Sequence, residues 1–274
     1  MDESTQKFLT DMKMEEVVII PLAELENDEI RRIKPTRNFT EYCWTLTPAV
    51  IRYCLERHQL PECTYLDADL YFFESPDLLL SEVKKASRDV LITPHNFTRI
   101  FDQTKGSGKY CVQFVYFKNS HRARALLEKW YRQCLEWCYD RVEEGRFGDQ
   151  KYLDSWPEDY PDVVWVQKHE GIGAPWNIQR YLVREEGHKI LIQRGREEFP
   201  LVFYHFHGLK RNQDGTYTFG PYPFSAAVRE KIYRRYLEAL KENRIEIEAS
   251  RAPMRRRTKF KLWVYERLYW FLRY

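Results

Sequence analysis

The sequence lacks any apolar run approaching the roughly 18–20 residues that a helix needs to span a bilayer. It also lacks the features of a secretory signal, because Met1 to Ser4 are acidic and polar. Its six cysteines show no framework spacing, which predicts reduced thiols rather than disulfides. These absences exclude the membrane-spanning and disulfide-rich secreted classes, and they predict a cytoplasmic protein.

The chain also has no internal repeat and no low-complexity linker. Its 274 residues, 43% hydrophobic and 31% charged, are enough for one large globular core. We therefore predict one domain over residues 1–250 and a C-terminal appendage over residues 251–274.

This appendage carries an unusual concentration of charge. The net charge of +3 hides eight basic residues and one acidic residue in 251–274, so the rest of the chain is mildly acidic. The same segment is rich in tryptophan and tyrosine, which is typical of a peripheral anchor on an anionic membrane surface. A closing helix that packs on the domain is the alternative. A nucleic-acid partner is not expected, because the body is acidic and shows no nucleic-acid motif.

Apolar segments alternate with helical patterns along the chain. This order predicts an α/β protein with one mixed sheet flanked by helices. The expected strands are 16–21, a short strand at 65–66 that ends at Asp67, 89–93, 113–117, 163–166 and 201–205. The expected helices are 4–13, 48–58, 77–85, 120–144 and 225–246, with a flexible loop at 105–108 and a helical turn near 149.

Two carboxylates follow a short apolar strand in Tyr65-Leu66-Asp67-Ala68-Asp69. Paired carboxylates at a strand end are costly unless a positive group neutralises them. A divalent cation that carries a diphosphate is the natural candidate, because Mg²⁺ and Mn²⁺ prefer oxygen ligands. The spacing alone is weak evidence, since acids two residues apart are common on solvated loops.

A second strand ends in the sequence His205-Phe206-His207-Gly208-Leu209-Lys210. An imidazole can join two carboxylates as a third metal ligand. Glycine lets the backbone approach a phosphate, and a lysine can neutralise that phosphate. The alternative is a pair of structural histidines bound to backbone partners, but the aspartate pair elsewhere in the chain favours a functional role.

Two further elements complete the set of candidates. Asp149 can cap the helical turn that follows it, which would direct Gln150 back toward the sheet edge. The loop that contains Trp176 and Asn177 presents a rigid indole after a proline. Such a ring serves either as a carbohydrate platform or as a core plug, and the sequence leaves both interpretations open.

These elements, in this order, resemble the nucleotide-sugar glycosyltransferases of the GT-A fold, and most closely the retaining enzymes of the family-eight type and their bacterial relatives. The resemblance covers the chain to about residue 210. It implies that Asp67 and Asp69 form the family's Asp-x-Asp motif and bind Mn²⁺ (or Mg²⁺) with the donor diphosphate. His205 matches the third metal ligand, Asp149 matches the acid that contacts the sugar, and Gln150 matches the residue near the anomeric carbon.

The resemblance also assigns roles to the flanking residues. Gly208 and Lys210 match positions at the phosphates, His207 is a reserve ligand or substrate contact, and Trp176 and Asn177 match a substrate element. Two features depart from the family pattern. Cys111-Val112-Gln113 replaces an Asn-x-Gly element at the sugar. By comparison with the family, we expect that about forty residues of an N-terminal strand–helix–strand unit are missing.

The resemblance implies transfer of a sugar from a nucleotide-diphosphate donor, with a UDP-sugar expected, to a glycan or lipid-linked acceptor. Such an enzyme would act in bacterial surface polysaccharide synthesis at the inner face of the plasma membrane. The main alternative is a non-catalytic or truncated relative that serves as a membrane-associated binding or assembly subunit. An aspartate-based phosphotransferase is the weakest alternative, because such enzymes place the motif near the chain start.

Overall fold

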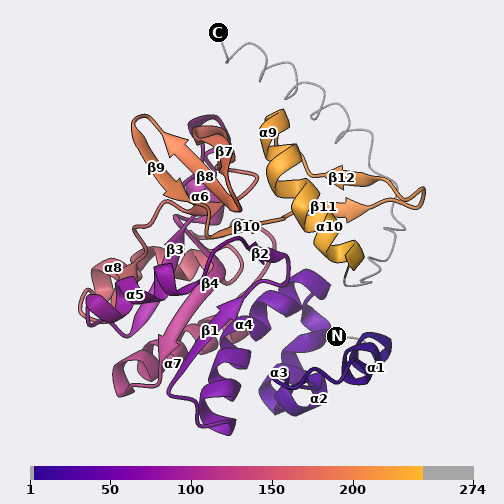
Figure 1. Ribbon diagram of the computed structural model, residues 1–274. Coiled ribbons are helices and arrows are strands. Elements are labelled where there is room, and N and C mark those ends of the chain that lie inside the picture. Colours follow the sequence, from indigo (N-terminus) through magenta and orange to yellow (C-terminus); the bar gives the residue numbers. More distant parts are fainter. Residues whose placement is uncertain (1–2, 243–274) are drawn as a thin grey trace.

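The computed structural model describes residues 3–242, whose chain forms a mixed α/β structure (Figure 1). Its main sheet has the strand order β1-β4-β3-β5. The four strands are β1 (Glu62–Leu66), β4 (Tyr110–Lys118), β3 (Val90–Pro94) and β5 (Val164–Val166). Strand β4 runs antiparallel to both neighbours, whereas β3 and β5 are parallel. The predicted α/β class with a mixed sheet and flanking helices is therefore confirmed.

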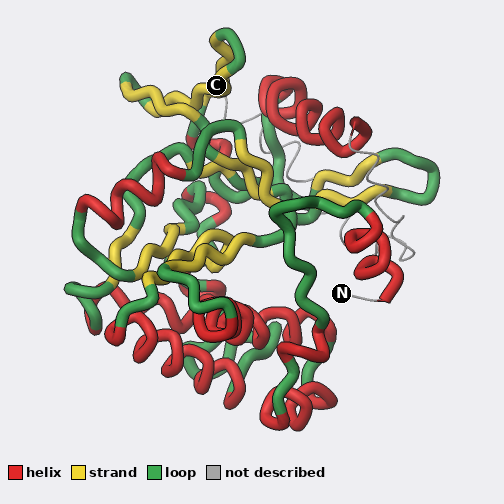
Figure 2. Tube along the Cα trace, turned by 60° about the horizontal axis from the view of Figure 1, so that its bottom comes forward, coloured by secondary structure: helices red, strands yellow, loops and turns green. Residues whose placement is uncertain are grey.

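Alternation along β4 places apolar side chains on both faces of this sheet. Val115 and Phe117 enter a core shared with α4 (Phe39–Arg57) and α7 (His121–Glu136). Phe114 and Tyr116 enter a second core shared with α5 (Asp77–Lys85). In the turned view of Figure 2, most of the helices lie on one side of the strands. The sheet is thus buried on both faces, which explains the continuous apolar run of β4.

A second, three-stranded sheet continues from the end of the first. It has the order β2-β10-β6, formed by β2 (Leu70–Phe72), β10 (Phe203–His205) and β6 (Ile172–Gly173). Strand β10 is antiparallel to β2 and parallel to β6. Residues 67–69 are the whole connection between β1 and β2, so the Asp-x-Asp motif lies where the two sheets meet.

The C-terminal part of the described chain adds a three-stranded sheet, a β-hairpin and a helix. The strands are β7 (Leu182–Glu186), β8 (Lys189–Arg194) and β9 (Glu197–Pro200), followed by the hairpin β11 (Leu209–Arg211) and β12 (Tyr217–Phe219). The final helix comprises α9 (Ala226–Val228), a π-helical segment (Arg229–Tyr233) and α10 (Arg234–Glu242). Tyr204 of β10, Phe206 just beyond it and Tyr233 of this helix pack in one core.

The remaining helices are short and lie mostly at the edges. The α-helices are α1 (Glu3–Asp11), α2 (Leu22–Leu25), α3 (Asp28–Ile33), α6 (Thr104–Ser107) and α8 (Trp156–Asp159). Single 3₁₀ turns span Lys34–Thr36, Arg99–Phe101, Gln150–Ser155 and Ile178–Arg180.

Three predicted segments differ from the structure near the N-terminus and the loops. The strand expected at 16–21 is wrong: Val17 and Val18 are exposed, and no strand forms there. A β-branched run satisfies local propensity but needs a neighbouring strand for its hydrogen bonds. The loop expected at 105–108 is instead largely the helical turn α6. The predicted single sheet is divided into four among the described residues.

Two predicted helices have different bounds in the structure. Helix α4 starts at Phe39 rather than at Pro48, because Asn38 and Glu41 form a reciprocal capping box. Pro48 lies inside the helix, where burial of residues such as Ile51 offsets the hydrogen bond that proline cannot make. Helix α7 ends at Glu136, since the chain becomes extended at Trp137 and buries that ring.

Within residues 3–242, no helix is both long enough and apolar enough to cross a membrane. The predicted basic, aromatic segment 251–274 lies outside the described residues.

Candidate metal centre

Asp67 and Asp69 are positioned by backbone hydrogen bonds to both sheets. The amide of Asp67 donates to the carbonyl oxygen of Gln113 on β4, at 3.0 Å. The carbonyl oxygen of Asp69 accepts from the amide of Phe206, at 2.8 Å. The second contact ties the motif directly to the His205-Phe206-His207 segment. Two elements that lie far apart in the sequence, and that we predicted to cooperate, are therefore adjacent.

His205 lies between the carboxylates of this motif. Its Nε2 atom is 2.9 Å from Oδ1 of Asp69 and 3.7 Å from Oδ2 of Asp67. Its Nδ1 atom donates to Oε1 of Gln113 at 2.6 Å, and both of these side chains are buried. Since an amide oxygen only accepts hydrogen bonds, this contact requires a proton on Nδ1 and directs Nε2 toward the carboxylates.

The two aspartates differ in their electrostatic surroundings. Burial, with the negative charge of Asp69, raises the pKa of Asp67 above its usual range, although His205 opposes this rise. Burial also acts against ionisation of Asp69, but the hydrogen bond and charge of His205 outweigh it and lower the pKa of Asp69. The Asp67 carboxylate additionally accepts a hydrogen bond from the Tyr65 hydroxyl, at 3.0 Å. Asp69 is thus the more readily ionised of the pair.

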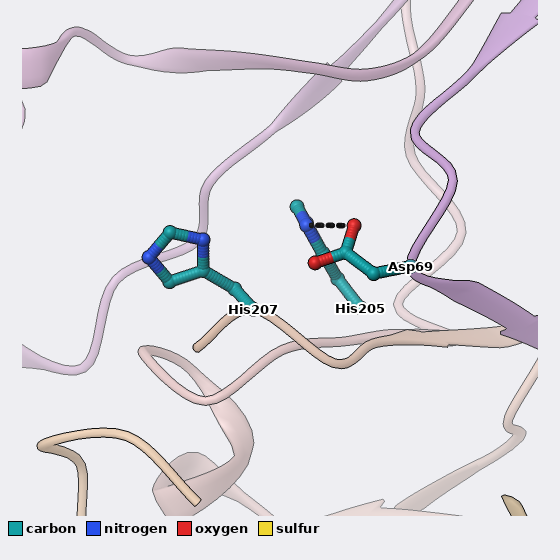
Figure 3. A group of neighbouring side chains, drawn as sticks. All are labelled: Asp69, His205 and His207. Carbon is teal, nitrogen blue, oxygen red and sulfur yellow. Dashed lines mark ion pairs between the residues drawn. The ribbon is translucent and has the colours of Figure 1, made fainter. Parts of the chain in front are cut away.

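The structure also brings His207 to the site. Asp69, His205 and His207 each offer one ligand atom, and these atoms all lie within 4.8 Å of one another. Figure 3 shows the two imidazoles and the Asp69 carboxylate together, with the ion pair between His205 and Asp69. Among the described residues this is the one cluster of its kind, and Asp67 adjoins it through His205.

Trp176 packs against the two histidines. Its buried ring makes edge contacts with His205, at a centroid distance of 5.2 Å, and with His207, at 5.7 Å. Its Nε1 atom donates to the carbonyl oxygen of His95, at 2.9 Å. The Asn177 amide donates to the same carbonyl, and its Oδ1 accepts from Ala174. Asn177 is therefore bound to the backbone, whereas Trp176 touches the histidines.

Asp149 is buried near Asp67, and it immediately precedes the 3₁₀ turn Gln150–Ser155. Its side chain makes no capping hydrogen bond, in contrast to the alternative role that the sequence suggested. Burial and the charge of Asp67 raise the pKa of Asp149 to about 7, against a hydrogen bond from Thr47. Its main chain is held by Trp130, whose Nε1 atom donates to the Asp149 carbonyl at 2.9 Å.

Gln150 points to a different neighbour. Its Nε2 atom donates to the carbonyl oxygen of Ser107 at 2.7 Å, which ties the 3₁₀ turn to α6. Lys151 reinforces this connection by donating to the Thr104 carbonyl at 2.8 Å. The Gln150 side chain therefore connects the 3₁₀ turn to α6. Its role near the reacting sugar stays a prediction.

Gly208 and Lys210 lie just beyond the histidines. Gly208 has a φ angle of +78°, a left-handed conformation that favours glycine, and this turns the chain into β11. Lys210 is exposed, and its charge contributes to lowering the pKa of His207, after the larger effects of burial and of His205. Both residues are near the cluster, and their predicted phosphate contacts are untested.

Two buried polar residues were not predicted as parts of the site. Gln113 holds His205, and its own Nε2 atom has no hydrogen-bond partner. His95 stacks on Phe97 and lies edge-on to Trp176, and its Nδ1 atom is likewise unpartnered. The signal for Gln113 was a polar residue inside an otherwise apolar strand, which is costly without a purpose.

Comparisons with known proteins place the chain beside two proteins of Bacillus subtilis (strain 168). The uncharacterized protein YfnF is 32% identical over 216 residues, which cover 77% of this chain and 70% of YfnF. The uncharacterized protein YfnD is 32% identical over 212 residues, which cover 76% of this chain and 66% of YfnD. No protein-family model matches the sequence.

A solved structure also shows partial similarity. The apo crystal structure of mouse xyloside xylosyltransferase 1 aligns with 76% of this chain and 82% of its own chain, at 13% identity and a TM-score of 0.45. A score this low assigns neither a fold nor an activity. The identity with YfnF, sustained over more than two thirds of that protein, does define a relationship. The chain belongs to the same protein family as YfnF of Bacillus subtilis.

Proposed function

We propose that this protein is a metal-dependent glycosyltransferase that moves a sugar from a nucleotide-diphosphate donor, such as a UDP-sugar, to a glycan or lipid-linked acceptor. The observation that carries the proposal is the meeting of Asp67, Asp69 and His205 at the junction of the two sheets. Their order along the chain, with Asp149-Gln150 between them, is the order of the family-eight-type resemblance.

The donor atoms suit a divalent cation. An octahedral ion bound at about 2.1 Å would hold neighbouring ligand atoms about 3.0 Å apart and opposite ones about 4.2 Å apart. The His205–Asp69 separation of 2.9 Å matches the first value, and the His205–Asp67 separation of 3.7 Å lies between the two. The contact to Gln113 holds the Nε2 atom of His205 on the side of the carboxylates. Carboxylate and imidazole ligands together bind Mn²⁺ well and bind Mg²⁺ less readily.

The surrounding residues supply binding, orientation and exclusion of water. A bound ion would act as a Lewis acid that offsets the charge developing on the diphosphate leaving group. Trp176 keeps the two imidazoles in place. Lys210, from the adjoining strand, can neutralise phosphate oxygens. Asp149 and Gln150 are proposed to contact the sugar, where no strong base is needed if the leaving group departs and the acceptor attacks on one face.

The acceptor and the location belong to the same proposal. The basic and aromatic sequence of 251–274 supports binding to an anionic membrane surface, and a lipid-linked acceptor for surface polysaccharide would be found there.

Isothermal titration of the full chain with UDP, with and without Mn²⁺, tests the proposal. We expect binding that depends on Mn²⁺ and is lost in Asp69→Ala, while Asp77→Ala, an exposed acid at the start of α5, serves as the matched control. Release of UDP from a panel of UDP-sugars should follow the same pattern. UDP binding that does not depend on Mn²⁺, or that is retained in Asp69→Ala, would contradict the proposal. Metal-dependent binding without any turnover would favour a non-catalytic binding subunit.

A further inference from the structure

His207 is the part of the metal cluster that the Asp-x-Asp and His205 assignment does not use. One of its ring nitrogens lies within 4.8 Å of the ligand atoms of both Asp69 and His205. Figure 3 shows the His207 ring beside His205, on the same side of the Asp69 carboxylate. His207 is the most exposed of the three side chains, so its ring nitrogen is accessible from solvent.

The surroundings of His207 favour a ligand role over a packing role. Its ring makes edge contacts with Trp176 and His205, at centroid distances of 5.7 Å each, and these contacts keep it beside the cluster. His207 lies beyond the end of β10, and Gly208 turns the chain directly after it.

A second imidazole changes which ion the site prefers. Mg²⁺ is bound almost entirely through oxygen atoms, whereas imidazole nitrogen suits transition metals. A donor set that adds a second imidazole to the carboxylates therefore favours transition-metal ions more strongly than an aspartate pair with one imidazole would. Along the first-row series, the preference should rise from Mn²⁺ to Co²⁺.

We propose that His207 is a direct metal ligand that makes this site selective for transition-metal ions over Mg²⁺. The inference rests on the proposed function, because it assigns the ion that the sugar-nucleotide site takes.

The test is metal binding to the full chain in the absence of any nucleotide, so that it does not depend on activity. Affinities for Mn²⁺, Co²⁺ and Mg²⁺ would be measured by titration calorimetry, and the visible absorption of bound Co²⁺ would report its donor atoms. The variants are His207→Ala and His207→Asp, and His188→Ala, in the exposed turn between β7 and β8, is the matched control.

Loss of an outer-shell partner already costs about 10–100-fold in metal affinity, so loss of a ligand should cost at least about tenfold. We expect that loss for Mn²⁺ and Co²⁺ in His207→Ala, with a much smaller change for Mg²⁺ and a shifted Co²⁺ spectrum. His207→Asp replaces a nitrogen ligand with an oxygen ligand, so it should reduce the difference in affinity between Mn²⁺ and Mg²⁺. His188→Ala should behave as the unmodified protein.

An unchanged Mn²⁺ to Mg²⁺ ratio and an unchanged Co²⁺ spectrum in His207→Ala would overturn the inference. If the unmodified protein still binds Mn²⁺ through Asp69 in that case, the proposed function stands and only the role of His207 fails. If the unmodified protein binds none of the three ions, both the inference and the metal-dependent function fail.

Discussion

Replacing Asp149 with asparagine should change how the stability of this protein depends on pH. The Asp149 side chain is only 3% exposed, and its pKa is raised from 3.8 to about 7 by burial and by the charge of Asp67. An unfolded chain would release this proton near the ordinary value, whereas the folded protein keeps it until near neutrality. The unfolded state therefore binds fewer protons in this interval, and stability falls as the pH rises through it.

The size of the effect follows from the shift. Each unit of pKa difference corresponds to about 1.4 kcal/mol, so a shift of about three units sets an upper limit of roughly 4 kcal/mol. The stability is fully present below the ordinary pKa of the carboxyl, and it is lost progressively until the pH passes the folded value of about 7. Between about pH 5 and pH 8, the free energy of unfolding should fall by as much as about 2.5 kcal/mol because of this group alone.

Urea denaturation of the metal-free protein, in the presence of a chelator, measures this directly. Asp149→Asn cannot ionise, so its stability relative to the unmodified protein should rise steadily over this pH range. Asp162→Asn, whose side chain is 83% exposed, makes the same chemical change outside the core and should show no comparable trend. A constant difference between Asp149→Asn and the unmodified protein over the whole range would refute the idea that burial holds this carboxyl protonated.

Substitutions at three other positions test the site and the fold. Gln113→Leu should lower the affinity for Mn²⁺ about 10–100-fold, because it releases His205. Gln113→Glu keeps the oxygen acceptor and should retain most of that affinity. Equal losses in both variants, measured by calorimetry, would contradict the orienting role of Gln113. Asn38→Ala removes the capping box of α4 and should cost about 1 kcal/mol in urea denaturation, so an unchanged midpoint would contradict the cap. Gly208→Ala forces a side chain into a left-handed conformation and should cost about 1–2 kcal/mol, which the same denaturation series would show or disprove.

Sequence patterns predicted the elements whose local signals agree with their packing. The strand before Asp67, the helix 77–85 and the strands around 90, 115, 164 and 203 all appear in the structure close to the predicted bounds. The apolar residues of the strands around 90 and 115 are buried, as their continuous apolar runs predict. The predictions failed where a local signal competed with a tertiary one. Residues 16–21 have strand propensity but no partner strand, and Pro48 resembles a helix start although a stronger capping box lies upstream.

The candidate site shows the same division. The sequence predicted that Asp67, Asp69 and His205 would meet, and the structure places them together at the sheet junction. The sequence named His207 only as a reserve ligand, whereas the structure places one of its ring nitrogens in a single cluster with Asp69 and His205. The sequence could not assign Gln113 to His205, since the two residues are 92 positions apart and meet only through sheet packing.

The sequence by itself determined the α/β class, the chemistry of the candidate ligands and the basic character of 251–274, because residue type and periodicity are local properties. Only the tertiary structure decided which ring nitrogen faces the carboxylates, why Asp149 keeps its proton toward neutral pH, and that Gln150 bridges to the Ser107 loop. Those outcomes depend on burial and on contacts between distant segments. Both are set by how the sheets and helices pack against one another.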